Sequence, residues 1–165
     1  MDPLSTFKYQ ITSESVDETQ KLGKIIGSAV SAGTVLALTG DLGSGKTSFV
    51  QGLAEGLEVP DDYYITSPSY TLINEYPGRF FLFHVDLYRI TDSIDIEDIG
   101  LYEIFDDDAV VAVEWVDRIE QKLSPDSITI HFEITGENTR NIFIYANKLN
   151  YIYLLEKLKA SIQAI

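Results

Sequence analysis

Residues 40–47 read Gly-Asp-Leu-Gly-Ser-Gly-Lys-Thr and match every fixed position of the phosphate-binding P-loop pattern G-x-x-x-x-G-K-[S/T]. The apolar run 34–39 precedes this stretch, and the helix-forming run 48–55 follows it. Glycines let the backbone turn so that successive N–H groups face phosphate oxygens, and the dipole of the following helix favours the same anion. The stretch therefore predicts a strand, a phosphate-binding loop and a helix; a glycine-rich turn before a surface helix is the alternative.

The motif also assigns roles to individual side chains. Lys46 is expected to reach the β- and γ-phosphates of a nucleotide, and the Thr47 hydroxyl to bind Mg²⁺. Residues 147–150 read Asn-Lys-Leu-Asn and lack the final Asp that binds guanine, so ATP is favoured over GTP. The expected nucleotide-binding residues of this stretch are Asp41, Leu42, Gly43, Ser44, Gly45, Lys46, Thr47 and Ser48.

Composition limits the class of protein. The chain has 165 residues, 45% of them hydrophobic and none of them cysteine, which suits one domain over residues 1–165 without disulfides or thiolate metal sites. A net charge of −14 opposes stand-alone binding of RNA or DNA and is equally consistent with a basic partner protein and with solubility alone. The sequence shows neither a signal-peptide pattern nor an apolar run of about 18 residues, so we expect a cytoplasmic protein with no membrane association.

Hydrophobic periodicity and turn residues predict alternating strands and helices. Ser15 and Glu18 form a capping box at the start of a helix that Gly33 is expected to end. The pattern predicts a three-layer α/β P-loop NTPase fold with a mostly parallel central sheet and an antiparallel C-terminal hairpin at its edge. The expected strands are 7–12, 34–39, 80–86, 109–115, 127–134 and 141–146, with a helix at 46–57, a loop at 60–68 and a helical tail at 151–165.

Two acidic residues, Asp86 and Glu114, end apolar strands. Parallel strands present their carboxyl ends at the edge where the P-loop lies, so one acid can hold Mg²⁺ while the other orients the attacking water. The acids therefore join Lys46 as expected catalytic residues and Thr47 as expected metal ligands. The alternative is that each acid only caps a strand end and pairs with an arginine.

Several other residues have two interpretations each. The segment 67–71, Ser-Pro-Ser-Tyr-Thr, either senses the γ-phosphate through its hydroxyls or forms an ordinary Ser-Pro turn. His84 lies inside an apolar strand and is expected to be a structural histidine with satisfied hydrogen bonds rather than a base. Trp115 packs either beside the nucleotide or in the core, and His131 is assigned no role.

Four segments, in their order and spacing, resemble the bacterial TsaE family, formerly YjeE. They are the P-loop, Ser-Pro-Ser-Tyr-Thr-Leu at 67–72, Phe-His-Val-Asp-Leu-Tyr-Arg at 83–89 and Val-Glu-Trp at 113–115. The resemblance implies the ATPase component of the machinery that installs a threonylcarbamoyl group on the adenosine next to the tRNA anticodon. Its implied partners are TsaB and TsaD, of which TsaD performs the transfer while ATP hydrolysis resets the complex. Contact with tRNA then falls to the partners.

The resemblance also carries over site residues. It implies phosphate contacts from residues 41–47, Mg²⁺ ligation by Thr47 and Glu114, Asp86 as a Walker-B-like acid, and Trp115 near the site.

The start of the chain at 13–15 and the hairpin loop from Gly136 to Arg140 would, by the same resemblance, approach the adenosine. The chain departs from the family at Ser69, where Thr is usual, and at Val116, where Pro often stands. A hydroxyl is kept at Ser69, so we expect γ-phosphate sensing to survive. The helical tail extends beyond the family core.

A small-molecule kinase of the P-loop class is the main alternative function. Such kinases clamp phosphates and acceptor with several arginines, whereas this chain has four and no paired cluster: Arg79, Arg89, Arg118 and Arg140. Arg89 and Arg118 are also the arginines that the two acids would pair with. A nucleotide-gated binding module with negligible turnover is a further alternative. No arginine finger is evident, so we expect Mg²⁺-dependent hydrolysis to be slow for the chain alone and stimulated by the partner proteins.

Overall fold

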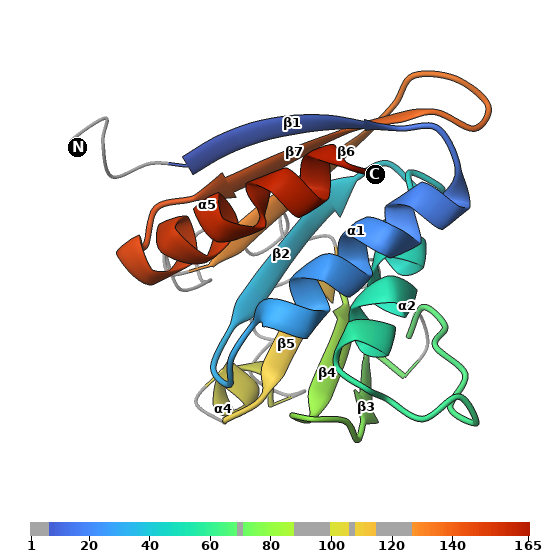
Figure 1. The fold of residues 1–165 in the computed structure, drawn as a ribbon. Helices are drawn as coiled ribbons and strands as arrows, with labels where there is room; N and C mark the ends of the chain where they lie inside the picture. Colours follow the sequence, from blue (N-terminus) through green and yellow to red (C-terminus); the bar gives the residue numbers. More distant parts are fainter. Residues whose placement is uncertain (1–6, 69–70, 88–99, 106–107, 115–126) are drawn as a thin grey trace.

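The structure, a computed structural model, describes residues 7–68, 71–87, 100–105, 108–114 and 127–165. Within these ranges seven strands form one mixed sheet in the order β1-β7-β6-β2-β5-β4-β3, which gives an α/β fold (Figure 1). The strands are β1 Phe7–Ser13, β2 Val35–Gly40, β3 Ile73–Tyr76, β4 Leu82–Asp86, β5 Val110–Glu114, β6 Ile128–Ile134 and β7 Arg140–Ala146. The helices are α1 Val16–Ala29, α2 Lys46–Gly56, α4 Leu101–Phe105 and α5 Leu149–Gln163.

The sheet is mixed rather than mostly parallel. The central strands β4, β5, β2 and β6 run parallel, whereas β3, β7 and β1 pair antiparallel with β4, β6 and β7. The prediction that the C-terminal hairpin lies at the edge is wrong, because β1 pairs with β7 along its whole length and covers the outer side of the hairpin. The sequence pattern does not predict β3, whose four residues are too few for a clear alternation. The other predicted strands, the helix at 46–57 and the tail helix lie within two residues of their expected bounds.

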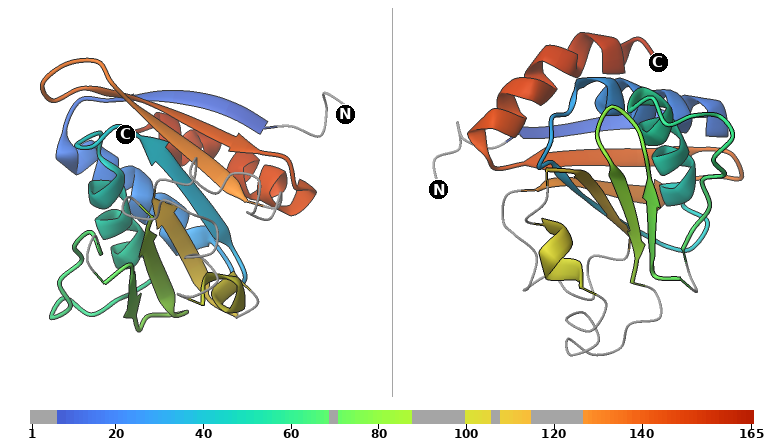
Figure 2. Two further views of the ribbon diagram at one scale, coloured as in Figure 1. Left: turned by 180° about the vertical axis from the view of Figure 1, so that it is seen from behind. Right: turned by 90° about the horizontal axis from the view of Figure 1, so that it is seen from below.

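Helices cover both faces of the sheet. Figures 1 and 2 show α1, α2 and α5 on one face and α4 on the other. The residues of β2 alternate between the two layers, with Leu36 and Leu38 in the core beneath α1 and α2, and Val35 and Ala37 in the second core, to which Ile104 of α4 belongs. A central strand buried on both faces explains why this run reads as continuously apolar.

Helices α1 and α2 pack closely through glycines, two on each helix and four residues apart: Gly23 and Gly27 on α1, Gly52 and Gly56 on α2. A Cβ at Gly52 would stand 1.9 Å from the carbonyl oxygen of Gln20, and one at Gly56 would stand 2.4 Å from that of Lys24. Gly23 and Gly27 of α1 are equally close to the backbone of α2, with hypothetical Cβ contacts of 2.2 and 2.3 Å. This contact fixes α2, and the loop at its N-terminus, directly against α1.

The start of α1 is anchored by short polar contacts. The Ser15 side chain caps the helix by accepting from the backbone N–H of Glu18, as predicted, and the Glu18 carboxylate accepts from the N–H of Glu14 rather than from that of the N-cap residue. The helix ends at Ala29, not at Gly33, because Gly33 (φ +88°) forms the turn that follows. Among the helices of the described ranges, none combines the length and the apolar composition that a membrane crossing requires.

Candidate functional site

The loop between β2 and α2 is built on glycines in conformations that side chains disfavour. Gly45 precedes α2 in the left-handed region with φ +112°, and Gly40 leaves β2 with φ +142°. A Cβ at Gly40 would also stand 2.6 Å from the carbonyl oxygen of Phe132 and 2.7 Å from the Ser44 hydroxyl. Glycine is therefore required at Gly40 for space as well as for backbone conformation.

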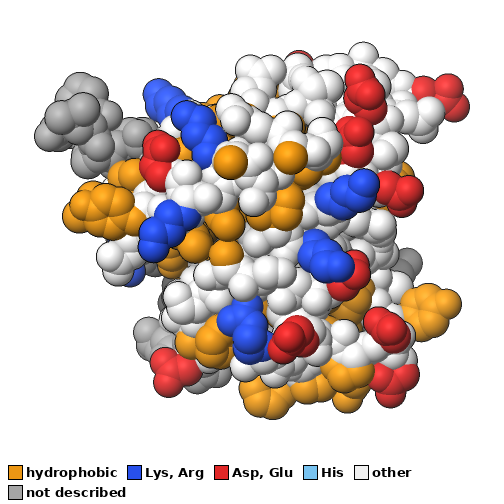
Figure 3. All heavy atoms as spheres, viewed as in Figure 1, with side chains coloured by type: hydrophobic (Ala, Val, Ile, Leu, Met, Phe, Trp, Pro, Cys, Tyr) orange, Lys and Arg blue, Asp and Glu red, His pale blue; other side chains and the backbone are white. Residues whose placement is uncertain are grey.

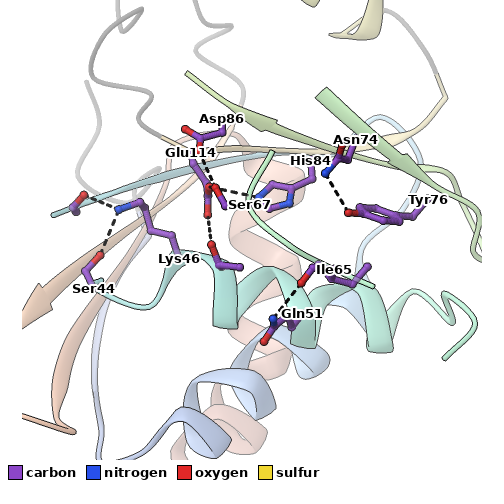
Figure 4. A network of polar contacts seen from close by, with 12 residues as sticks. Ser44, Lys46, Gln51, Ile65, Ser67, Asn74, Tyr76, His84, Asp86 and Glu114 are labelled. Carbon is purple, nitrogen blue, oxygen red and sulfur yellow. Dashed lines mark hydrogen bonds and ion pairs between the residues drawn. The ribbon is translucent and has the colours of Figure 1, made fainter. Parts of the chain in front are cut away.

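Lys46 lies inside this loop and is 5% exposed. Its Nζ donates to the carbonyl oxygens of Gly40 and Asp41, at 2.6 and 2.9 Å, and to the Ser44 hydroxyl at 3.4 Å. Figure 4 shows the ammonium group held between Ser44 and a loop carbonyl. The structure thus places a buried cation where the sequence motif predicts the phosphate-binding lysine, while Leu42 is exposed at the loop tip.

Two carboxylates face this loop from the ends of neighbouring parallel strands. Asp86 and Glu114 lie opposite each other in the β4–β5 register, and both are 2% exposed. The Thr47 hydroxyl donates to Glu114 Oε1 at 3.1 Å. The Ser67 hydroxyl lies 2.6 Å from Asp86 Oδ2 and 3.3 Å from Glu114 Oε2 (Figure 4). The predicted juxtaposition of the P-loop threonine with both acids is therefore present.

The chemistry of this oxygen cluster fits a magnesium ion. Two neighbouring buried carboxylates repel each other unless a cation or hydrogen-bond donors compensate them. Mg²⁺ takes one or two carboxylates, a hydroxyl, water and substrate phosphate, and it does not need an all-protein cage. Within the described residues no group of three or more His, Cys, Asp or Glu side chains could hold a metal by itself, so phosphate and water would have to complete the coordination.

His84 lies behind the acid pair. It is completely buried, and its Nε2 is 3.5 Å from Glu114 Oε2 (Figure 4). Its position in the β4 core agrees with a structural histidine, but the expectation of satisfied hydrogen bonds is wrong. Within the described part of the chain, neither ring nitrogen has a hydrogen-bond partner. His84 therefore contributes shape and a weak polar contact to Glu114.

Ser67 is the site residue that the sequence interpretation did not single out. The hydroxyls of segment 67–71 predict γ-phosphate sensing, and Ser67 is the member whose hydroxyl contacts both acids. The feature of the sequence that indicates Ser67 is its position between the P-loop helix and the strand that ends in Asp86. The predicted residues Ser69 and Trp115 lie outside the described residues, as do Arg89, Arg118 and Val116.

Arg140 joins the loop to the β6–β7 turn. Its Nε donates to the carbonyl of Ser44 at 3.2 Å and its Nη2 to that of Gly43 at 3.1 Å. Its Nη1 donates to the carbonyls of Gly136 and Thr139, at 2.9 and 2.8 Å, within the turn.

A cleft of about 80 Å³ lies beside this junction. Residues of the α1 start, the P-loop, the first turn of α2 and the β6–β7 turn line it together, among them Ser15, Gly45, Ser48 and Asn138. The two segments expected near the adenosine, 13–15 and 136–140, therefore both reach the phosphate-binding loop.

Comparison with known proteins places this geometry in a family. The family model described as Threonylcarbamoyl adenosine biosynthesis protein TsaE matches residues 13–142. The chain belongs to the TsaE family. Proteins named tRNA threonylcarbamoyladenosine biosynthesis protein TsaE are similar to it in Bacillus subtilis (38% identity; 86% of this chain, 88% of the relative) and in Treponema pallidum (36% identity; 80% and 96%). The crystal structure of YdiB from Bacillus subtilis superimposes with a TM-score of 0.81 at 32% identity, covering 94% of this chain and 97% of YdiB.

The residues matched to TsaE contain the whole site. The P-loop, Ser67, both acids and Arg140 lie between residues 13 and 142, whereas α5 follows the matched range. The match to the TsaE family therefore spans the elements that build the phosphate loop and the acid pair.

Proposed function

We propose that this TsaE family member is a P-loop NTPase that hydrolyses ATP with Mg²⁺ during the biosynthesis of threonylcarbamoyladenosine in tRNA. The role in this biosynthesis follows from membership of the family. The ATPase activity is our inference from the site, and one observation supports it above all. The buried acids Asp86 and Glu114, with the hydroxyls of Thr47 and Ser67 bonded to them, stand beside a loop that holds a buried lysine.

The residues divide the work as follows. Loop N–H groups and Lys46 would bind the triphosphate, and Lys46 would exchange its loop carbonyls for phosphate oxygens when ATP is bound. Thr47 and Glu114 would hold Mg²⁺, which neutralises charge on the phosphates. Asp86, whose carboxylate lies 2.6 Å from the Ser67 hydroxyl, would orient the attacking water. Ser69, Trp115 and Gly136 would contact the nucleotide, as the resemblance to the family implies.

The proposed partners are TsaB and TsaD, with tRNA contacted only through them. A net charge of −14 supports this division, because a strongly acidic chain is poorly suited to bind RNA directly. Both arginines in the described ranges bind backbone carbonyls, Arg79 at the end of α1 and Arg140 at the P-loop, so neither is arranged as an arginine finger. Slow hydrolysis by the chain alone and stimulation by the partners follow, since a finger supplied in trans is worth about 10³–10⁵ in rate.

Nothing in the described site favours the small-molecule kinase. A kinase of this class would need free guanidinium groups converging on the phosphates, and the backbone contacts of Arg79 and Arg140 provide none.

Steady-state ATP hydrolysis across a Mg²⁺ titration tests the proposal, with the native chain compared with the Lys46→Ala variant, which lacks the phosphate-binding lysine. We expect turnover that requires Mg²⁺ in the native chain and none above background in Lys46→Ala, with unchanged circular dichroism. A Lys46→Ala protein that hydrolyses ATP at the native rate would remove the P-loop from the reaction.

A further inference from the structure

The phosphate-binding loop is held by cations on two sides. Lys46 takes the carbonyls of Gly40 and Asp41 from within the loop. Arg140, at the end of the β6–β7 turn, donates hydrogen bonds to the carbonyls of Gly43 and Ser44. Four of the five loop carbonyls from residue 40 to 44 therefore have a cationic donor.

These two contacts have different fates when a nucleotide arrives. Under the proposed function, Lys46 turns to the phosphates and releases the carbonyls it holds. The contacts of Arg140 involve the carbonyl side of the peptide groups, so they can persist while the N–H groups serve the phosphates. Among the residues that the structure describes, Arg140 is then the side chain that still holds loop carbonyls.

Arg140 is itself fixed firmly enough to serve as an anchor. It opens β7 and lies opposite Ile134 of β6 and Ser13 of β1 in the sheet register. The turn before it is closed by the backbone bond from Thr135 to Thr139 at 3.1 Å and by a bond between their hydroxyls at 3.0 Å. Figure 1 shows this turn at the same end of the sheet as the carboxyl end of β2 and the start of α1.

We propose that Arg140 is a positioning residue that holds the phosphate-binding loop in its binding conformation before the nucleotide arrives. It acts through the carbonyls of Gly43 and Ser44, and it need not touch the phosphates. The inference concerns the site of the proposed function and rests on it for the nucleotide, but the order of the empty loop is a property of the protein alone. Its positive charge also raises the local potential in a chain of net charge −14.

The test compares the Arg140→Lys and Arg140→Gln variants with the native chain. Hydrogen bonds from charged donors are stronger than those from neutral donors, and Arg140→Gln replaces two of them at the loop. We therefore expect Arg140→Gln to weaken binding of a fluorescent ADP analogue with Mg²⁺ about 10- to 100-fold. The KM for ATP should rise by a similar factor, while kcat at saturation stays within about threefold, because binding energy then restores the loop. Arg140→Lys keeps the positive charge but loses the paired donors of the planar guanidinium group. Its affinity for the ADP analogue is expected to lie between those of the native chain and Arg140→Gln.

Amide hydrogen exchange of the nucleotide-free proteins supplies the decisive readout. Exchange of the N–H groups of residues 41–46 should accelerate in Arg140→Gln, while exchange in the α1–α2 core and the urea midpoint change little. Arg79→Gln is the matched control, because Arg79 also donates to backbone carbonyls, those of Gly27 and Val30. It should alter exchange near the end of α1 only.

Two outcomes would overturn the inference. If Arg140→Gln loses affinity for ADP but the exchange of the empty loop is native, Arg140 contacts the phosphates directly. If neither quantity changes, Arg140 only closes its own turn. A native chain that binds no nucleotide at all would refute the proposed function instead, and the exchange measurement would still decide whether Arg140 orders the loop.

Discussion

The contact between α1 and α2 predicts that Gly52→Ala destabilises the protein, although alanine is the better helix former. The new Cβ would stand 1.9 Å from the carbonyl oxygen of Gln20 and 2.7 Å from its carbon. Contacts of Cβ below 3.0 Å are essentially never seen, so the helices would have to separate by about 1 Å or more. The obstacle is backbone, which cannot rotate away as a side chain can.

The magnitude follows from two opposing terms. Overpacking of this kind costs about 1–3 kcal/mol. The upper end applies because a Cβ at Gly23, Gly27 or Gly56 would also be too close to backbone, at 2.2, 2.3 and 2.4 Å. The gain in helix propensity returns about 1 kcal/mol. We therefore expect the free energy of unfolding to fall by about 2 kcal/mol.

Urea denaturation followed by circular dichroism measures this change, with Ser28→Ala as the control. Ser28 is exposed on α1, one residue after Gly27, and its substitution should stay within about 0.5 kcal/mol of the native value. Because α2 begins with Lys46 and Thr47, Gly52→Ala should also weaken nucleotide binding. A Gly52→Ala protein as stable as the native chain would show that the helices are not held at this distance.

Two further predictions concern the acid pair. Glu114→Gln should raise the Mg²⁺ concentration needed for half-maximal ATP turnover by about tenfold or more. Asp86→Asn should raise this concentration less, because of the two acids only Glu114 accepts a hydrogen bond from Thr47. A larger Mg²⁺ effect in the Asp86 variant would make Asp86, and not Glu114, the metal ligand. Ser67→Ala removes the hydroxyl shared by both carboxylates and should lower the stability of the Mg²⁺-free protein by about 1 kcal/mol. MgATP should then raise the melting temperature of Ser67→Ala by more than it raises that of the native chain. Equal rises in the two proteins would show that Ser67 does not compensate the charge of the acids.

The parts of the site that the sequence predicts are those with local signals. The P-loop pattern fixes a strand, a turn and a helix within one stretch, and Asp86 and Glu114 each end an apolar run. Adjacent parallel strands bring such residues to one edge whatever the rest of the fold does. Their burial and their closeness to Thr47 follow from that topology.

The parts that it does not predict depend on contacts between distant segments. The alternating pattern of β1 predicts a strand but not its partner, which begins more than 125 residues later at Arg140. Gly23 and Gly52 are ordinary helix residues in sequence, and only the packing of α1 on α2 shows why no side chain fits. Arg140 is one arginine among four until the fold brings its guanidinium to the P-loop carbonyls.

The most direct test of the proposed function is the formation of threonylcarbamoyladenosine on tRNA by the matching TsaB and TsaD proteins over many turnovers. The native chain and Lys46→Ala would be compared, with ATP hydrolysis followed in the same reactions. We predict that the native chain supports repeated modification while its ATP turnover rises with the partners, and that Lys46→Ala supports neither. Repeated modification that proceeds equally well with Lys46→Ala, or without the chain, would contradict the account.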